Sequence, residues 1–130
     1  MSIADQEAIE GTLPLAIARQ MGVIAKRPLA NVAWTYERKP SEPYYQAYWS
    51  RLRKLDYPFL KSAPDAAVST ALRFTLSVPG VHTAIVGTTK PARWQGNAAL
   101  LSAGMLPSAE LERIRARWRE VAGASWNGQV

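Results

Sequence analysis

The sequence has no cysteine and only one histidine, His82, among its 130 residues. Without thiols it offers no disulfide framework, no thiolate zinc site and no cysteine nucleophile. No apolar run approaches the roughly 18 residues that a membrane span requires. The first ten residues carry acidic rather than basic side chains, which argues against a signal peptide. We therefore expect a soluble, cytoplasmic protein with no metal site and no membrane partner.

Acidic residues are also scarce, with 10 Asp and Glu against 16 Lys and Arg, for a formal net charge of +6. Much of the positive charge lies in residues 51–54 and 113–119. Such a charge attracts the phosphates of a nucleic acid or of a nucleotide cofactor. Glutamates interrupt the second run, as expected on a solvated helix face. No nucleic-acid recognition motif accompanies the charge, so a nucleic-acid partner is not expected.

Apolar spacing, together with the positions of glycine and proline, predicts helices alternating with strands. The helices are expected at 3–21, 64–78, 90–103 and 107–122, and the strands at 23–25 and 81–86. This alternation indicates an α/β fold with a parallel sheet in one domain, residues 1–130. Two buried strands do not make a sheet covered on both faces. The sequence therefore suggests a part of something larger.

The segment 26–63 is predicted to be a long loop region, because Pro28, Pro40, Pro43 and Pro58 interrupt it. It is rich in aromatic residues, and 44–49 suggests a short helix whose rings pack inward. A loop of this length is uncommon unless it covers a functional site. An aromatic cap over the core is an equally good interpretation, and the sequence leaves both open.

The turn from Val86 to Arg93 is the most distinctive local pattern. A strand ends, Gly87 lets the backbone turn, and Thr88 and Thr89 precede a helix N-terminus. Free N–H groups and the helix dipole make such a place attractive to an anion. Arg93 is expected one turn into the helix, where its guanidinium suits a phosphate. Threonine at a helix N-cap is also ordinary capping, so the pattern alone leaves both interpretations open.

These residues carry a family resemblance. The stretch from Val68 to Lys90, the following Arg93 and Asn97, and the helix entry 106–112 resemble the C-terminal part of the aldo/keto reductases. Residues 22–31 resemble that family's seventh strand and the loop after it. The resemblance implies a (β/α)8 TIM barrel that reduces aldehydes or ketones with NADPH. This chain would hold about the last two to three βα units and a C-terminal helix at 107–122, with the N-terminal half absent.

The resemblance also assigns cofactor contacts after the eighth strand. Gly87, where the family often has lysine, begins the turn, and Thr88 and Thr89 would supply hydroxyl and backbone contacts. Arg93 would meet the 2′-phosphate of NADP, and Asn97 would contact the adenine.

A second group of contacts is implied after the seventh strand, where Arg27 and Leu29 would lie near the pyrophosphate. Lys26 stands where the family commonly has an aromatic residue against the nicotinamide. The family's catalytic residues belong to the missing half, so no catalytic residue is assigned. His82 lies near the start of the last predicted strand, whereas barrel chemistry takes place at the carboxyl ends of strands, so a structural or surface role is expected for it.

The expected function is therefore that of an NADP-dependent oxidoreductase of the aldo/keto reductase type, present as a C-terminal part. It would keep the adenosine-phosphate side of the NADP(H) site and lack the reaction centre. Its partners would be NADP(H) and the missing N-terminal half. The alternative is a non-catalytic, self-associating module, because exposed strand edges pair readily with a second copy.

Overall fold

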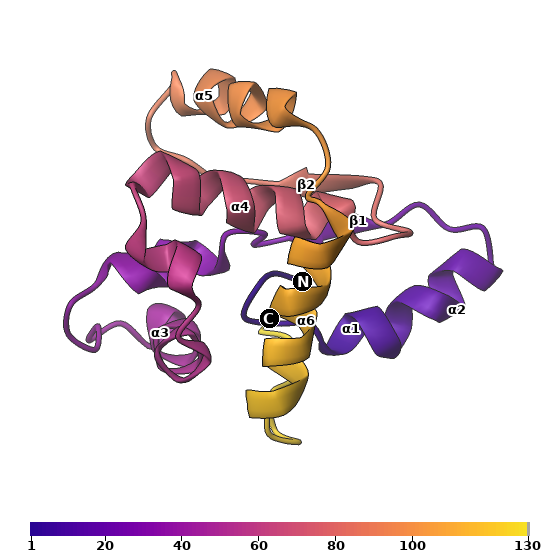
Figure 1. Ribbon diagram of the computed structural model, residues 1–130, viewed down its shortest axis with the longest axis horizontal. Helices are drawn as coiled ribbons and strands as arrows, with labels where there is room; N and C mark the ends of the chain where they lie inside the picture. The colour runs from indigo at the N-terminus through magenta and orange to yellow at the C-terminus, as the bar shows by residue number, and fades with distance from the viewer. Residues whose placement is uncertain (130) are drawn as a thin grey trace.

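A computed structural model describes residues 1–129, and helices account for more than half of them (Figure 1). The α-helices are α1 (Glu7–Glu10), α2 (Thr12–Ala18), α3 (Pro43–Leu55), α4 (Pro64–Ser77), α5 (Arg93–Leu100) and α6 (Ser108–Val121). The 3₁₀-helices are η1 (Ala30–Thr35), η2 (Pro58–Lys61) and η3 (Leu101–Ala103). None of the helices in this part of the chain is long and apolar enough to cross a membrane.

The strands β1 (Ile24–Lys26) and β2 (Thr83–Ile85) form a two-stranded parallel sheet in which Ala25 lies opposite Ala84. Side chains alternate between the two faces of a strand. Ala25 is buried, whereas Ile24 and Ile85 point to the other face and are 60% and 59% exposed. The helix α4 packs against β2. The described sheet therefore has one face that carries exposed isoleucines.

The prediction of a partial (β/α)8 barrel is wrong, and the structure is a small α/β fold dominated by helices. A barrel closes a continuous sheet of eight strands, whereas this sheet contains two strands of three residues each. The sheet is this short because the backbone at Arg27 turns left-handed, with φ of 57°, directly after β1. The strand β2, predicted over 81–86, can pair only with those three residues, although the predicted parallel α/β arrangement is present.

The first predicted helix is divided into two short ones, since α1 ends before Gly11 and α2 ends at Ala18. Its predicted apolar stripe is therefore only half correct. Ile9 and Leu13 are buried, but Ile17 and Met21 are 51% and 55% exposed. The stripe fails after Leu13, because Ile17 lies at the exposed end of α2 and Met21 lies beyond that helix.

The segment 26–63, predicted as a long loop with a short helix at 44–49, contains the longer, 13-residue helix α3 (Pro43–Leu55). Pro43 occupies the first turn of α3, where a missing N–H removes no helical hydrogen bond. Among the aromatic residues, Tyr48 and Tyr57 are buried in the core, whereas Tyr44 at the start of α3 is 53% exposed. Tyr48 and Tyr57 thus fit the interpretation of an aromatic cap over the core, whereas Tyr44 lies outside the core.

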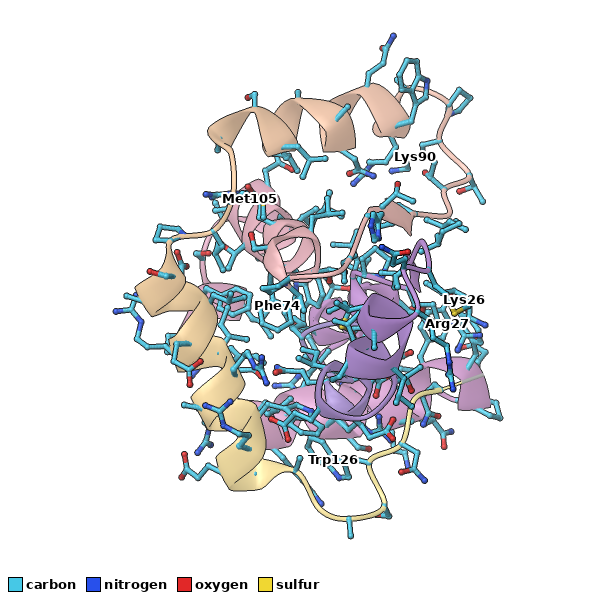
Figure 2. All side chains as sticks on the ribbon, turned by 90° about the vertical axis from the view of Figure 1, so that its right-hand side faces the viewer. Lys26, Arg27, Phe74, Lys90, Met105 and Trp126 are labelled. Atoms are coloured by element: carbon cyan, nitrogen blue, oxygen red, sulfur yellow. The ribbon has the colours of Figure 1, made fainter. Side chains whose placement is uncertain are left out.

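The core lies where α3, α4 and α6 meet the N-terminal segment, with Phe74 of α4 fully buried at its centre (Figure 2). The Tyr57 hydroxyl links three parts of the chain. It donates to the Ile3 carbonyl at 3.0 Å, accepts from Gln6 Nε2 at 3.3 Å and lies 3.2 Å from the Ile114 carbonyl oxygen. Burial raises the pKa of Tyr57 well above its ordinary value, so the phenol keeps its proton.

A buried ion pair joins Asp5 in the N-terminal segment to Arg51 of α3. The Arg51 guanidinium also donates to the Asn127 carbonyl at 2.9 Å and lies 5.4 Å from the Trp126 ring. The Asp5 carboxylate accepts from the Gln129 backbone N–H at 3.4 Å. This cluster holds residues 126–129 beside the N-terminal segment, close to the centre of the molecule (Figure 1).

Candidate functional site

A cleft of about 720 Å³ opens at the carboxyl ends of β1 and β2, and we call it the carboxyl-end cleft. Its walls are formed by residues of 26–32, Tyr44 and Tyr45, Val68, residues 85–90, Arg93 and Asn97. Parallel pairing brings both strand ends to one edge, with Lys26 opposite Ile85. In α/β proteins this edge is the usual place for a ligand. The volume falls within the roughly 300–1,000 Å³ that is typical of small-molecule sites.

Four cationic side chains line the carboxyl-end cleft, namely Lys26, Arg27, Lys90 and Arg93, and no aspartate or glutamate does. None of the four forms an ion pair with a carboxylate of residues 1–129. Figure 2 shows Lys90 beside α5, whereas Lys26 and Arg27 lie below it on the body of the molecule. Cations on both sides of a cleft attract an anionic ligand and concentrate the field within it.

The loop after β2 holds itself in place through Thr88. Its hydroxyl accepts from the Lys90 backbone N–H at 3.1 Å. The helix α5 begins at Arg93 rather than at the predicted Lys90, so Arg93 is the first helical residue and not one turn further on. No side chain caps this N-terminus. Arg93 and Asn97 are one turn apart on α5, and both line the cleft.

Gly87 is not needed for the turn, contrary to the sequence-based argument. Its φ is not positive, and a Cβ added there would meet nothing within 4 Å. The position therefore borders open space along the wall of the cleft.

The segment after β1 adopts an unusual backbone, since Arg27, Ala30, Asn31 and Val32 all have φ between 45° and 57°. A β-branched residue such as Val32 rarely adopts this left-handed conformation, which stores local strain. Hydrogen bonds secure the segment at two points. Asn31 Nδ2 donates to the Tyr44 carbonyl at 3.3 Å, and the Arg27 guanidinium donates to the Gln129 carbonyl at 3.0 Å.

Arg27 also interacts with the aromatic side chains of α3. Its guanidinium carbon lies 4.7 Å from the centre of the Tyr44 ring. Burial alone would lower the pKa of Arg27, but the Tyr48 and Tyr44 phenol groups beside it outweigh that effect and raise it. Arg27 is therefore a cation at every accessible pH.

All seven residues predicted as cofactor contacts line this one cleft. They are Arg27, Leu29, Gly87, Thr88, Thr89, Arg93 and Asn97. Leu29 and Asn97 are buried, at 7% and 8% exposure, and the three residues of the loop are exposed. The chain separates the two groups by more than 50 residues, and the β1–β2 pairing brings them together.

Sequence reasoning did not place Lys26, Lys90, Tyr44 and Tyr45 in the site, although all four line the cleft. Lys26 directly follows the apolar residues of the predicted strand. Ligands bind at the carboxyl ends of parallel strands, so a charged residue in this position could have been predicted to line the site. Tyr44 was expected in a short helix at 44–49 whose rings pack inward, whereas it is exposed at the start of α3.

His82 lies before β2, at the end of the sheet opposite the cleft, and its Nδ1 accepts from the Val23 backbone N–H at 3.1 Å. This contact joins the entries of the two strands. The expected structural or surface role of His82 agrees with this position, and no part in chemistry at the cleft follows from it.

Comparison with protein-family models finds no match for this chain. Comparison with curated proteins finds no match either. Comparison with solved structures likewise finds none.

Proposed function

We propose that this chain is an NADP(H)-binding protein related to the aldo/keto reductases, with the adenosine-phosphate side of the cofactor in the carboxyl-end cleft. The observation that carries the proposal is the convergence of seven residues, chosen from sequence alone, on one cleft. Two of the seven are arginines, two lysines join them in the lining, and no carboxylate does. Two chain segments far apart in sequence supply them.

The chemistry of the cleft fits the phosphate groups of a dinucleotide. Phosphate oxygens accept hydrogen bonds and carry negative charge, and Arg and Lys supply the matching donors. Lys90 and Arg93 flank the uncapped start of α5, where the helix dipole also favours an anion. The Thr88 hydroxyl donates to the Lys90 carbonyl at 3.4 Å and accepts from the Lys90 backbone N–H at 3.1 Å. The hydroxyl of Thr89 and the remaining backbone groups are therefore what the loop offers a ligand.

No catalytic role is assigned within the cleft. The cofactor supplies the hydride in a carbonyl reduction, and the protein must supply a positioned proton donor. The resemblance carries none of the family's catalytic residues onto this sequence. The proposal is therefore for cofactor binding, with the reaction centre supplied by residues outside this chain.

The test measures the dissociation constants of NADPH and NADH for the wild-type chain and for Arg93→Ala. Loss of charge-assisted hydrogen bonds to a 2′-phosphate weakens binding about 10- to 100-fold. We expect a loss of this size for NADPH and little change for NADH, which lacks the 2′-phosphate.

Arg113→Ala is the matched control, because Arg113 is an exposed arginine of α6 outside the cleft. It should leave both constants unchanged. Equal losses of NADPH and NADH affinity in Arg93→Ala would overturn the 2′-phosphate assignment. Absence of NADPH binding to the wild-type chain would overturn the proposed function.

One observation favours a second candidate, a self-associating module. Parallel sheets in proteins are normally covered on both faces, yet Ile24 and Ile85 remain exposed on one face of this sheet. Each strand also has an edge that no other described strand pairs with. A second copy of the chain would cover this surface.

Sedimentation velocity over a range of concentrations tests this candidate. Ile24→Lys should shift the chain toward monomer, whereas Met105→Lys should not, because Met105 is similarly exposed but belongs to the segment between η3 and α6 and not to the sheet. A wild-type chain that stays monomeric at the highest concentrations reached would eliminate self-association.

A further inference from the structure

One wall of the carboxyl-end cleft is aromatic, and neither the net charge nor the phosphate contacts account for it. Tyr44 and Tyr45, at the start of α3, line the cleft together with Arg27. The two tyrosine rings meet edge to face, with centres 5.3 Å apart and planes at 88°. The Arg27 guanidinium covers the Tyr44 ring at 4.7 Å. We call these three residues the ring wall.

The ring wall is fixed from several directions. Tyr36 packs against Tyr45 from behind, with ring centres 5.4 Å apart. The Tyr44 backbone carbonyl accepts from Asn31, and Gln129 holds the far end of the Arg27 side chain. Side chains held in this way lose little further freedom when a ligand binds, which favours affinity.

Exposure distinguishes the ring wall from ordinary core packing. Tyr48, one turn along the same helix, is 2% exposed and belongs to the core, whereas Tyr44 is 53% exposed. Tyr44 thus lies about half exposed, with Arg27 over one side of its ring, in a cleft that four cationic side chains line. Planar rings stack favourably on tyrosine faces and on arginine guanidinium planes.

We propose that the ring wall binds a planar aromatic ring of the ligand whose phosphates the cationic side chains hold. The ligand class is therefore a phosphate group joined to an aromatic base, rather than a simple phosphate or a sugar phosphate. This inference rests on the proposed function for the phosphates but assigns different residues. In NADP⁺ the ring would be either the bicyclic adenine or the smaller nicotinamide, and each presents a planar face for stacking.

Calorimetric titration of four probes tests the proposal: inorganic pyrophosphate, adenosine 2′,5′-bisphosphate, nicotinamide mononucleotide and NADP⁺. Each is titrated into the wild-type chain, Tyr44→Leu and Tyr44→Phe. Stacking of one base on an aromatic side chain is worth at least about a fivefold change in affinity. We expect Tyr44→Leu to lose at least this factor for NADP⁺ and for one of the two mononucleotides, and to leave pyrophosphate unchanged.

The mononucleotide that loses affinity identifies the ring that lies on the wall. Tyr44→Phe should keep the wild-type affinities, because the ring and not the hydroxyl makes the contact. Trp94→Leu is the matched control and should keep the wild-type affinities, since Trp94 is also an exposed aromatic residue but does not line the cleft. A thermal melt of each variant verifies that it folds.

Equal affinities of wild type and Tyr44→Leu for every probe would overturn the ring wall and leave the proposed phosphate site intact. A uniform loss that includes pyrophosphate would also overturn it, because Tyr44 would then act only by shaping the cleft. A wild-type chain that binds none of the four probes would overturn both the ring wall and the proposed function.

Discussion

The buried ion pair between Asp5 and Arg51 allows the sharpest prediction of stability. The side chains of Arg51 and Asp5 are only 8% and 4% exposed. Asp5→Ala removes the carboxylate and leaves the guanidinium buried, a change that typically costs about 3–5 kcal/mol. The guanidinium keeps its hydrogen bond to the Asn127 carbonyl and its contact with Trp126, so we expect the lower end, about 3 kcal/mol.

Urea unfolding followed by tryptophan fluorescence measures this loss directly. A total stability of about 5–15 kcal/mol is typical of a domain, so the variant should still fold and show a clearly lower midpoint. The double variant Asp5→Leu/Arg51→Met removes both charges and should recover most of the loss, because an apolar pair of similar volume is often neutral or stabilising. A loss below about 1 kcal/mol in Asp5→Ala, or a double variant no better than the single one, would refute the reasoning.

Three further predictions concern other parts of the fold. Tyr57 keeps its proton in the folded chain but ionises near pH 10 in the unfolded chain. Its contribution to the free energy of unfolding is therefore full below pH 10 and falls as the pH rises above that value. The free energy of unfolding of Tyr57→Phe should therefore fall less steeply with pH above 10 than that of the wild type, and equal slopes would contradict this. Gly80 has φ of 90°, so Gly80→Ala should cost about 1–2 kcal/mol in urea unfolding, with exposed Ile17 moving aside from the new methyl group. Asp56 ends α3 with φ of 44°, and Asp56→Gly should raise the urea midpoint, because glycine adopts this backbone freely and the Lys61 ion pair is exposed. A lower midpoint would contradict the last prediction.

The alternation of strands and helices was predictable, because apolar spacing and glycine or proline breaks are local signals. The strand after Gly22 and the helix that begins at Pro64 follow from them directly. The lengths of the strands could not be predicted from these local signals. The strand β2 is limited by its partner β1, which ends where Arg27 turns left-handed, and pairing length is a property of two distant segments.

The candidate site was predictable where a motif carried it and not where packing did. The loop at Thr88 and Thr89 was visible from sequence, and Arg27 was placed by resemblance. The helix α5 was also expected there, but it begins at Arg93 and not at the predicted Lys90. The left-handed residues Ala30 and Val32 gave no signal, since alanine and valine seldom adopt this backbone. The contact of Arg27 with Gln129 spans 102 positions, and no local pattern reports a contact at that range.

The pairing of β1 with β2 also determines when the carboxyl-end cleft comes into existence during folding. The entries of the two strands are joined across 59 positions, between Val23 and His82. Closing so large a loop costs chain entropy before any contact offsets it, so such pairings form late. Local helices such as α3 and α4 can form first, and neither builds the cleft alone. During synthesis, a ligand for this cleft meets a binding surface only after the chain has been made as far as Asn97.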